Sequence, residues 1–316
     1  MGLIGLGGMG KTHFLNSLRI KTVKVVAVAD TSRAACQFAK VHGVAKVYDD
    51  YAKLLDNPDI DCVAIALPTF LHAQSAVMAA ECGKHILLEK PLARNTREGK
   101  LIVSKVQKAG VKAMMGYPLR FSDLARIKAE IDGGHLGEVV TAQATDVWRG
   151  PFFHLPVSDW WLDPELSGGG ALIDLGPHMI NLLLWYFGDK IASIKSQLGY
   201  RFNMPFEDYA LCMIKFKQGT LATVNVGWYC QQNTISIELF GTMKRASAAL
   251  TSAKSWSRIL HTLRVKPFAE SLAFYRELNH FVNCIIADRD PSPSAADGLK
   301  DLEVISVAYK NQIRED

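Results

Sequence analysis

The sequence lacks several features that would define its class at once. It has no low-complexity segment, no block of like charge and no internal repeat, and 49% of its 316 residues are hydrophobic against 21% charged. This composition is typical of a folded globular protein and argues against a disordered regulator. The 36 basic and 31 acidic residues are mixed along the chain, so the net charge of +5 provides no basic stripe for nucleic acid.

Paired cysteines and long apolar runs are also absent. The six cysteines are scattered, with no C-x-x-C pair and no histidine at metal-ligand spacing, so we expect reduced thiols, no metal and a cytoplasmic protein. The longest apolar runs, such as Cys62 to Leu67, are far shorter than the roughly 20 residues of a membrane span. The glycine-rich start leads straight into a folded-domain motif, which predicts neither a targeting segment nor a membrane partner.

The first part of the chain has the pattern of a parallel sheet. Short, almost continuously hydrophobic segments alternate with amphipathic ones up to about residue 118, as expected for strands covered by helices on both faces. The expected strands are Gly2–Leu6, Val23–Ala29, Ala45–Tyr48, Cys62–Leu67, His85–Glu89 and Lys112–Gly116. Helices are expected at 34–42, 71–82 and 97–109, the last capped by Asn95 or Thr96. The sequence therefore predicts an α/β, doubly wound Rossmann domain over residues 1–118.

Residues 119–316 follow a different pattern. After a linking helix at 119–131, longer stretches alternate apolar and polar residues, as half-buried strands do: Val139–Val147, Ala192–Arg201, Tyr209–Phe216, Leu221–Trp228 and Ile235–Phe240. Lys217-Gln218-Gly219 separates two of these and predicts a hairpin turn. Helices at 271–287 and 295–313 close the chain. We expect an α+β domain on a large open, mostly antiparallel sheet that serves substrate binding and oligomerisation.

A glycine motif at the N-terminus predicts a dinucleotide site. Gly5-Leu6-Gly7-Gly8-Met9-Gly10 matches G-x-G-x-x-G, follows an apolar strand and opens an amphipathic helix near Met9. Such glycines allow a tight turn, the approach of backbone N–H groups to a pyrophosphate, and close packing of helix on strand. Asp30 lies 20 residues after Gly10, where a carboxylate binds the ribose hydroxyls of NAD. The alternative is an ordinary glycine-rich turn with Asp30 as a helix cap.

The residues after the second strand bear on the choice of cofactor. Asp30 would repel a 2′-phosphate and favours NAD, whereas Ser32 and Arg33 are side chains that could bind one and favour NADP. We expect NAD, with NADP as the alternative. Arg33 also has a simpler interpretation, as a solvated residue in the first turn of a helix.

Two further segments carry catalytic side chains. Glu89-Lys90-Pro91 ends the fifth predicted strand, at the edge where ligands of doubly wound folds bind. In the second half, the run from Gly168 to His178 places Asp174 and His178 four residues apart, hence on one face if the segment is helical. Together with the glycine motif, these segments closely resemble the glucose-fructose oxidoreductase and inositol dehydrogenase (Gfo/Idh/MocA) family, over nearly the whole chain.

The resemblance implies an NAD(P)-dependent enzyme that oxidises a secondary hydroxyl of a sugar, polyol or nucleotide sugar, or reduces the ketone. It makes Lys90, Asp174 and His178 the catalytic candidates. Histidine suits proton removal near neutral pH, so we expect His178 to be the base, Asp174 to orient it or bind a substrate hydroxyl, and Lys90 to hydrogen-bond the reacting oxygen. Each also has a structural alternative: a surface lysine, a helix-face histidine in a polar contact, and an aspartate favoured by a helix dipole.

The remaining candidates are assigned by motif position. The predicted cofactor-binding set is Gly5, Gly7, Gly8, Met9, Gly10, Asp30, Ser32, Arg33, Leu67, Pro68, His72, Glu89, Lys90 and Tyr117. The predicted substrate-binding set is Lys90, Tyr117, Arg120, Trp148, Trp161, Asp174 and His178. Pro118 departs from the family pattern and leaves the role of Tyr117 open, His72 could instead cap its helix, and the tryptophans serve equally well as core residues. Asn181 stands where many relatives have an acidic residue.

Two other functions compete with the dehydrogenase. A non-catalytic NAD(P)-binding sensor would not need Lys90, Asp174 and His178. A glycosidase of the same family that uses tightly held NAD would hydrolyse its substrate without net turnover of the cofactor. By analogy with the family, we also expect a homo-oligomer, either a dimer or a tetramer.

Overall fold

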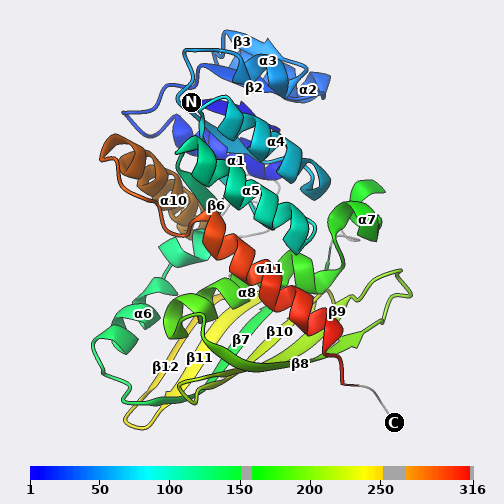
Figure 1. Ribbon diagram of the computed structural model, residues 1–316, viewed down its shortest axis with the longest axis vertical. Helices are drawn as coiled ribbons and strands as arrows, with labels where there is room; N and C mark the ends of the chain where they lie inside the picture. Colours follow the sequence, from blue (N-terminus) through cyan, green and yellow to red (C-terminus); the bar gives the residue numbers. More distant parts are fainter. Residues whose placement is uncertain (151–158, 252–267, 314–316) are drawn as a thin grey trace. The chain divides into compact units, whose positions relative to one another are not determined.

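The protein divides into two compact units. Its structure, a computed structural model, describes residues 1–150, 159–251 and 268–313. The first unit comprises Met1–Pro118 and Phe268–Leu299, and the second comprises Leu119–Pro267 and Lys300–Asp316 (Figure 1). The division after residue 118 agrees with the change of sequence pattern. Residues 268–299, which we expected in the second domain, group instead with the first.

Six parallel strands form the sheet of the first unit, as predicted. In the order β3-β2-β1-β4-β5-β6 they are Lys46–Tyr48, Ala27–Ala29, Gly2–Ile4, Cys62–Ile65, His85–Glu89 and Ala113–Gly116. The chain order reverses between β1 and β4. In a doubly wound sheet the crevice at the carboxyl ends of such a strand pair is where ligands bind, so this topology marks the expected cofactor position.

The helices of this unit alternate with its strands along the chain. They are α1 (Gly8–Ser17), α2 (Arg33–Val41), α3 (Tyr51–Leu55), α4 (Thr69–Glu81) and α5 (Thr96–Ala109). Asn95 caps α5 as predicted, because its side chain accepts a hydrogen bond from the backbone N–H of Glu98 at 3.0 Å. The short helix α3 was not predicted; Asp50 caps it by accepting from the N–H of Ala52 at 2.8 Å.

Helix α10 (Phe268–Ile286) joins the first unit because it packs on α1. The ring of Phe274 meets His13 of α1 edge-on, with centroids 6.2 Å apart, and the guanidinium of Arg19 lies over the ring of Tyr275. After α10 the chain also pairs with the sheet edge, where the N–H of Met115 donates to the carbonyl of Pro293 at 2.9 Å. Helix α11 (Ala295–Lys310) then begins in this unit and ends in the second.

The second unit is built on a mixed, mostly antiparallel sheet, again as predicted. In the order β12-β11-β7-β10-β9-β8 its strands are Arg245–Thr251, Thr234–Gly241, Val139–Val147, Leu221–Gly227, Tyr209–Phe216 and Ile191–Gly199. Only the β7–β10 pair is parallel. The predicted hairpin turn joins β9 to β10, with the N–H of Gly219 donating to the carbonyl of Phe216. Strand β12 was not predicted.

The expected linking helix at 119–131 is divided into two pieces. A 3-10 helix, η1 (Pro118–Phe121), precedes α6 (Ala125–Asp132). Ser122 stands between them: its hydroxyl donates to the carbonyl of Leu119 at 2.7 Å, and its oxygen lies 3.2 Å from the N–H of Leu124. These local side-chain bonds compete with continued helix and explain the break.

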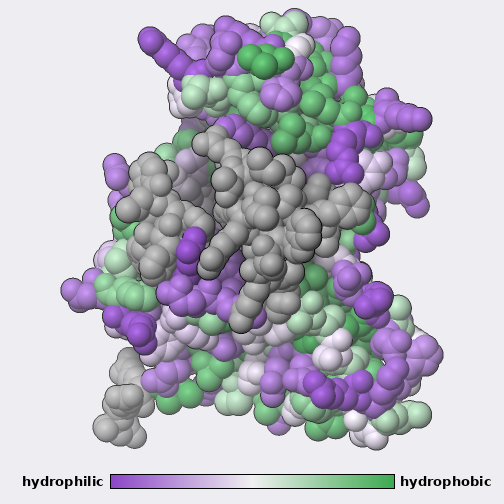
Figure 2. Space-filling view, turned by 180° about the vertical axis from the view of Figure 1, so that it is seen from behind, coloured by the Kyte–Doolittle hydropathy of each residue, from purple (hydrophilic) through white to green (hydrophobic). Residues whose placement is uncertain are grey.

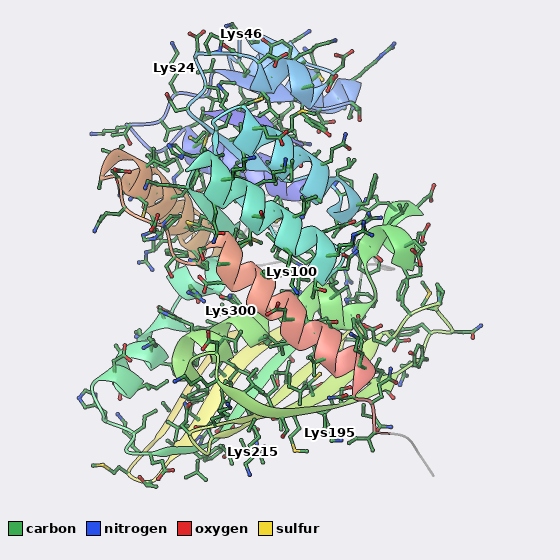
Figure 3. All side chains as sticks on the ribbon, in the orientation of Figure 1. Lys24, Lys46, Lys100, Lys195, Lys215 and Lys300 are labelled. Carbon is green, nitrogen blue, oxygen red and sulfur yellow. The ribbon has the colours of Figure 1, made fainter. Side chains whose placement is uncertain are left out.

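Helix α8 (Ala171–Phe187) covers one face of the second sheet (Figure 1), where it packs on β7, β9 and β10. The strand residues beneath it are buried and often small, among them Ala142, Ala144, Ala210 and Ala222, so helix and sheet approach closely. The alternate residues face outward. They include Lys195 and Lys215, which Figure 3 labels on β8 and β9, and the exposed apolar residues Leu211 and Met213. The second unit also contains η3 (Asp159–Leu162) and α7 (Pro164–Ser167).

None of the helices in the described ranges combines the length and apolarity that crossing a bilayer requires. The six cysteines, all within those ranges, are free thiols.

The packing of α10 on the first unit predicts a difference between two of its side chains. Leu278 is completely buried, whereas Ile286 at the end of the helix is 64% exposed. Leu278→Ala should lower the free energy of unfolding by about 2–5 kcal/mol, because it leaves a cavity. Ile286→Ala is the control and should change it little. Chemical denaturation measures both, and equal small effects would contradict the packing of α10.

Candidate functional site

The glycine turn of the first unit fits a dinucleotide pyrophosphate. It connects β1 to α1, and Gly7 and Gly8 at the start of the helix are exposed. A side chain at Gly10 would place its Cβ 1.9 Å from the carbonyl oxygen of Gly5, so only glycine lets α1 start so close to the turn. A Cβ at Gly7 would meet nothing within 4 Å. The open space in front of the helix N-terminus suits an anion, because the first N–H groups of a helix have no acceptor within the helix.

Asp30 is held in place by the same turn. Its Oδ2 accepts from the N–H of Leu6 at 2.6 Å, and its Oδ1 accepts from the N–H of Ser32 at 2.7 Å. The carboxylate is therefore fixed beside the glycine motif, at the end of β2, where the ribose of a dinucleotide is expected. The hydroxyl of Ser32 caps α2 by accepting from the N–H of Ala35 at 3.4 Å, and Arg33 is exposed in the first turn of that helix.

Lys90 directly follows β5 and is half-buried. The adjacent Glu89 is buried, its Oε1 lies 2.6 Å from Nε2 of His13 on α1, and its Oε2 accepts from the N–H of Lys90 at 3.3 Å. Burial opposes ionisation of Glu89, but the hydrogen bond and charge of His13 and the charge of Lys90 outweigh it and lower the pKa of the carboxyl. The lysine thus stands next to a buried carboxylate.

His72 braces the neighbouring segments. Its Nδ1 lies 2.7 Å from the carbonyl oxygen of Pro91, and its Nε2 lies 2.9 Å from that of Leu67. Burial lowers the pKa of His72, so a neutral ring with one N–H can donate to only one of the two oxygens. His72 is 1% exposed, and its contacts differ from the helix cap considered above. Leu67 and Pro68, between β4 and α4, are half-buried.

Two other candidates lie at the ends of elements in the first unit. Met9 is half-buried in the first turn of α1. Tyr117 follows β6 and is 1% exposed, and Pro118 immediately after it begins η1. The departure from the family motif at Pro118 therefore coincides with the start of a 3-10 helix.

Helix α8 presents the two catalytic candidates of the second unit. The segment is helical, which meets the condition stated above, so Asp174 in its first turn and His178 one turn later lie on the same side, and both are partly exposed. Their neighbours Leu175 and Met179 are buried. The helix therefore holds a carboxylate and an imidazole together at its accessible edge.

A buried carboxyl from outside the helix fixes the start of α8. Glu207 precedes β9, and its Oε1 accepts from the N–H of Leu172 at 2.9 Å and from the hydroxyl of Tyr309 at 2.8 Å. Its carbonyl accepts from the N–H of Ala171. Burial raises the pKa of Glu207, although the two hydrogen bonds oppose the shift. Gly170 is required here, because a Cβ would lie 1.9 Å from the carbonyl oxygen of Glu207.

Trp161, a predicted substrate contact, is part of an aromatic cluster. The ring of Trp161, in η3, lies 4.5 Å from that of buried Trp228 and 6.3 Å from that of Phe206, measured between centroids. Trp161 is nevertheless partly exposed, as are Trp148 and Arg149 at the end of β7. The core interpretation and the binding interpretation of Trp161 are thus both compatible with its position.

Arg120 is tied to the interior of the second unit. Its Nε donates to Oδ1 of Asn181 at 2.6 Å, and its guanidinium lies over the ring of Trp185. Asn181 is buried and donates to Asp301 at 2.8 Å. An amide at position 181 can accept from Arg120 and donate to Asp301, whereas an acid that accepted from Arg120 would face the carboxylate of Asp301.

The sequence did not single out Glu207, Tyr309, His13 or Glu277 as supporting residues. Their partners lie far away in the chain, 76 residues apart for His13 and Glu89. A polar residue within an apolar helical pattern, such as Glu277 in α10, was the one available signal. Within the described residues, no group of three or more histidines, cysteines or carboxylates is placed to hold a metal ion.

The glycine turn predicts opposite effects of two similar substitutions. Gly10→Ala should lower the thermal stability of the free protein, because its Cβ clashes with the backbone of Gly5. Gly7→Ala should leave that stability nearly unchanged but weaken NAD binding, because the methyl group occupies the space of the pyrophosphate. Thermal unfolding and calorimetric titration with NAD separate the two effects. Unchanged NAD affinity of Gly7→Ala would contradict this placement of the cofactor.

The sequence and structure were compared with known proteins. Residues 1–117 match the profile described as an oxidoreductase family with an NAD-binding Rossmann fold, and residues 124–247 match that of the GFO/IDH/MocA C-terminal domain. The chain is 29% identical to the scyllo-inositol 2-dehydrogenase (NAD(+)) of Bacillus subtilis, over 99% of this chain and 93% of that protein. It is 26% identical to the levoglucosan dehydrogenase of Pseudarthrobacter phenanthrenivorans, over 95% and 92%.

Solved structures give the same result for the fold. The complex of levoglucosan dehydrogenase with NADH and levoglucosan superposes with a TM-score of 0.85 at 23% identity, over 98% of this chain and 95% of that one. The scyllo-inositol dehydrogenase from Lactobacillus casei with NAD(H) and scyllo-inositol gives 0.82 at 21% identity, over 98% and 96%. With both halves matched, the chain belongs to the GFO/IDH/MocA family of NAD-binding oxidoreductases.

Proposed function

We propose that this oxidoreductase transfers a hydride between NAD and a secondary hydroxyl of a sugar or polyol. The observation that carries the proposal is a set of side chains contributed by both units: Lys90 after β5, and Asp174 with His178 on one side of α8. The relatives named above are dehydrogenases of an inositol and of an anhydrosugar. A cyclic compound with several hydroxyl groups is therefore the substrate class to test.

The first unit supplies the cofactor site. Bound NAD would supply the hydride acceptor; Gly7, Gly8 and Gly10 would hold its pyrophosphate and Asp30 its ribose. The proposed cofactor set also includes Gly5, Met9, Ser32, Arg33, Leu67, Pro68, His72, Glu89, Lys90 and Tyr117. Of these, His72 and Glu89 act through the segments they hold, because their polar atoms contact the protein itself.

Each proposed catalytic residue has a task suited to its chemistry. His178 removes the proton from the hydroxyl oxygen as hydride leaves the carbon that bears this hydroxyl, because a neutral imidazole is a good base near pH 7. Asp174, one turn earlier, orients the imidazole or binds a neighbouring hydroxyl. Lys90 donates to the reacting oxygen, and its positive charge stabilises the developing alkoxide. The proposed substrate contacts are completed by Tyr117, Arg120, Trp148 and Trp161.

Two alternatives are less well supported. A sensor that only binds NAD has no need of a lysine, a carboxylate and an imidazole in these positions. An NAD-dependent glycosidase would use the same residues, but it would hydrolyse a glycoside with no net formation of NADH. We also propose a cytoplasmic location, which follows from the thiol content and the cofactor.

The first test combines a substrate panel with one substitution. Purified protein given NAD and a panel of inositols, hexoses, anhydrosugars and UDP-sugars should form reduced nicotinamide with at least one of them. His178→Ala should lower kcat about 100- to 10,000-fold, the usual contribution of a general base, and leave the Kd for NAD nearly unchanged.

The control for this substitution is His135→Ala, since the His135 side chain is 63% exposed between α6 and β7. It should retain full activity. Loss of NAD binding in His178→Ala, or equal activity of the two variants, would contradict the proposed roles.

We further propose that the open face of the second sheet is the contact between subunits of a homodimer or homotetramer. Leu211, Met213 and Phe240 are 51%, 41% and 38% exposed there, among polar neighbours such as Thr223 and Asn225. From behind (Figure 2), the protein surface mixes green hydrophobic residues with purple hydrophilic ones. A closed symmetric contact would cover the apolar rows.

A charge on this face should separate the subunits. Leu211→Glu is expected to reduce the molar mass in solution to that of one chain, because the buried carboxylate would lack a partner. Val41→Glu in α2, at a side chain 73% exposed in the first unit, is the control. Size-exclusion chromatography with light scattering gives the masses. A wild-type monomer, or an unchanged oligomer of Leu211→Glu, would refute this assignment.

A further inference from the structure

Three titratable side chains from separate elements are buried together next to the strand end that carries Lys90. His13 comes from α1, Glu89 from β5 and Glu277 from α10, and they are 1%, 7% and 0% exposed. Helix α10 packs on both α1 and β5. The ring of Phe274, one turn before Glu277, contacts that of His13. The three elements therefore meet at these side chains.

Only some of the polar atoms in this group have a hydrogen-bond partner. His13 and Glu89 contact each other through Nε2 and Oε1 at 2.6 Å. Neither oxygen of Glu277 nor Nδ1 of His13 has a hydrogen-bond partner among the described residues, although all three atoms are buried. The backbone N–H of Tyr117 also interacts with Glu277 and lowers its pKa, but this N–H donates to the carbonyl of Met115.

Charge balance indicates the protonation state of each of the two carboxyl groups. Two buried carboxylates would need two cations, and a buried ion without a partner is far more costly than a buried neutral acid. Glu89 has His13 on one side and Lys90 on the other. Glu277 has Glu89 as its electrostatic neighbour, and burial together with that negative charge raises its pKa well above the ordinary value. Glu277 is thus the carboxyl that keeps its proton.

We propose that His13, Glu89 and Glu277 form a buried positioning cluster that fixes Lys90, with His13 and Glu89 in direct contact and Glu277 as its neutral member. The cluster links the helix of the glycine turn to the strand that ends at Lys90. Gly116 on the neighbouring strand leaves room for it, since a Cβ there would lie 3.1 Å from the Glu89 carboxyl. The inference rests on the proposed role of Lys90.

The charged and titratable groups around Lys90 decide how the cluster acts on it. Lys90 interacts with Glu89 beside it and with His72 from α4, and Glu89 in turn interacts with His13 from α1 and Glu277 from α10. His72 and Glu277 are neutral near pH 7, because burial shifts the pKa of each in the direction of its neutral form. Among these groups Glu89 is the one with a lowered pKa, and its negative charge favours the ammonium form of Lys90.

The first experiment needs no substrate and tests the state of Glu277. A carboxyl with a higher pKa in the folded than in the unfolded protein lowers stability as pH rises above about 4.3, because the unfolded chain releases its proton first. The Tm of Glu277→Gln relative to wild type should therefore rise by several degrees between pH 5 and pH 8. Glu138→Gln, at an exposed carboxyl, should give a flat difference. A flat difference for Glu277→Gln would overturn the proposal.

The second experiment tests the effect on Lys90 in the active enzyme. In a plot of kcat against pH, we assign the fall at high pH, the alkaline limb, to loss of the proton of Lys90. Glu89→Gln removes the neighbouring negative charge, so this limb should move to lower pH. Glu89→Asp keeps the charge but breaks the 2.6 Å contact; kcat should fall at least about tenfold with the limb unmoved. Glu277→Gln should also leave the limb in place.

The two experiments can fail separately. An unmoved limb in Glu89→Gln, or unchanged kcat in Glu89→Asp, would overturn the positioning role of the cluster. If no substrate of the panel is oxidised, the proposed function fails, but the stability measurement still decides whether Glu277 is the neutral member.

Discussion

Helix α1 can begin against the turn that precedes it only because position 10 has no side chain, and α8 can begin against Glu207 only because position 170 has none. The N-cap residue of each helix is a glycine, Gly7 for α1 and Gly170 for α8, which has no side chain to accept from the first N–H groups. The N-terminal donors are then used differently. Those of α1 face open space at Gly7 and Gly8, where an anion can accept from them. Those of α8 are already bound by Glu207, so that helix is fixed as a support for Asp174 and His178.

Buried polar groups hold the positions that the backbone leaves free. Glu207 with Tyr309, Asn181 with Asp301 and Arg120, and His13 with Glu89 each join elements distant in the sequence. Apolar residues of similar size would often stabilise such sites equally well, but they would not select one orientation. All three groups support segments that carry proposed site residues. These buried polar groups therefore serve to position the segments of the proposed site more than to stabilise the fold.

The sequence predicted elements wherever the signal was local. The limits of β5, β7 and β9 agree with the predicted ranges, because hydrophobic runs and alternation are read from neighbouring residues. Strand β12 was missed because its alanines and serines give a weak apolar pattern, and α3 because five residues form little more than one turn. The range of α10 was predicted closely, but not its unit, since periodicity shows which face is apolar and not what covers it.

The same limit applies to the site. Lys90, Asp174 and His178 belong to short motifs, so the sequence alone is enough to propose them as site residues. The residues that hold those segments, Glu207 and Glu277 among them, are carboxyls whose meaning depends on partners from other elements. A buried acid cannot be told from a surface acid by its neighbours in the chain alone. Motif spacing proposes the catalytic residues, whereas the residues that hold their segments are recognised only in the fold.

The surroundings of Asp30 also bear on the cofactor. Two backbone N–H groups hold its carboxylate, one on each oxygen, so the negative charge cannot rotate away from a ligand at the end of β2. Ribose hydroxyls can donate to the remaining lone pairs of these oxygens. A 2′-phosphate has no proton to offer at neutral pH and would be repelled. The hydroxyl of Ser32 is used in capping α2, and Arg33 is an exposed side chain that gains little from a screened contact. A 2′-phosphate would thus meet a fixed carboxylate without a matching fixed cation, which favours NAD over NADP.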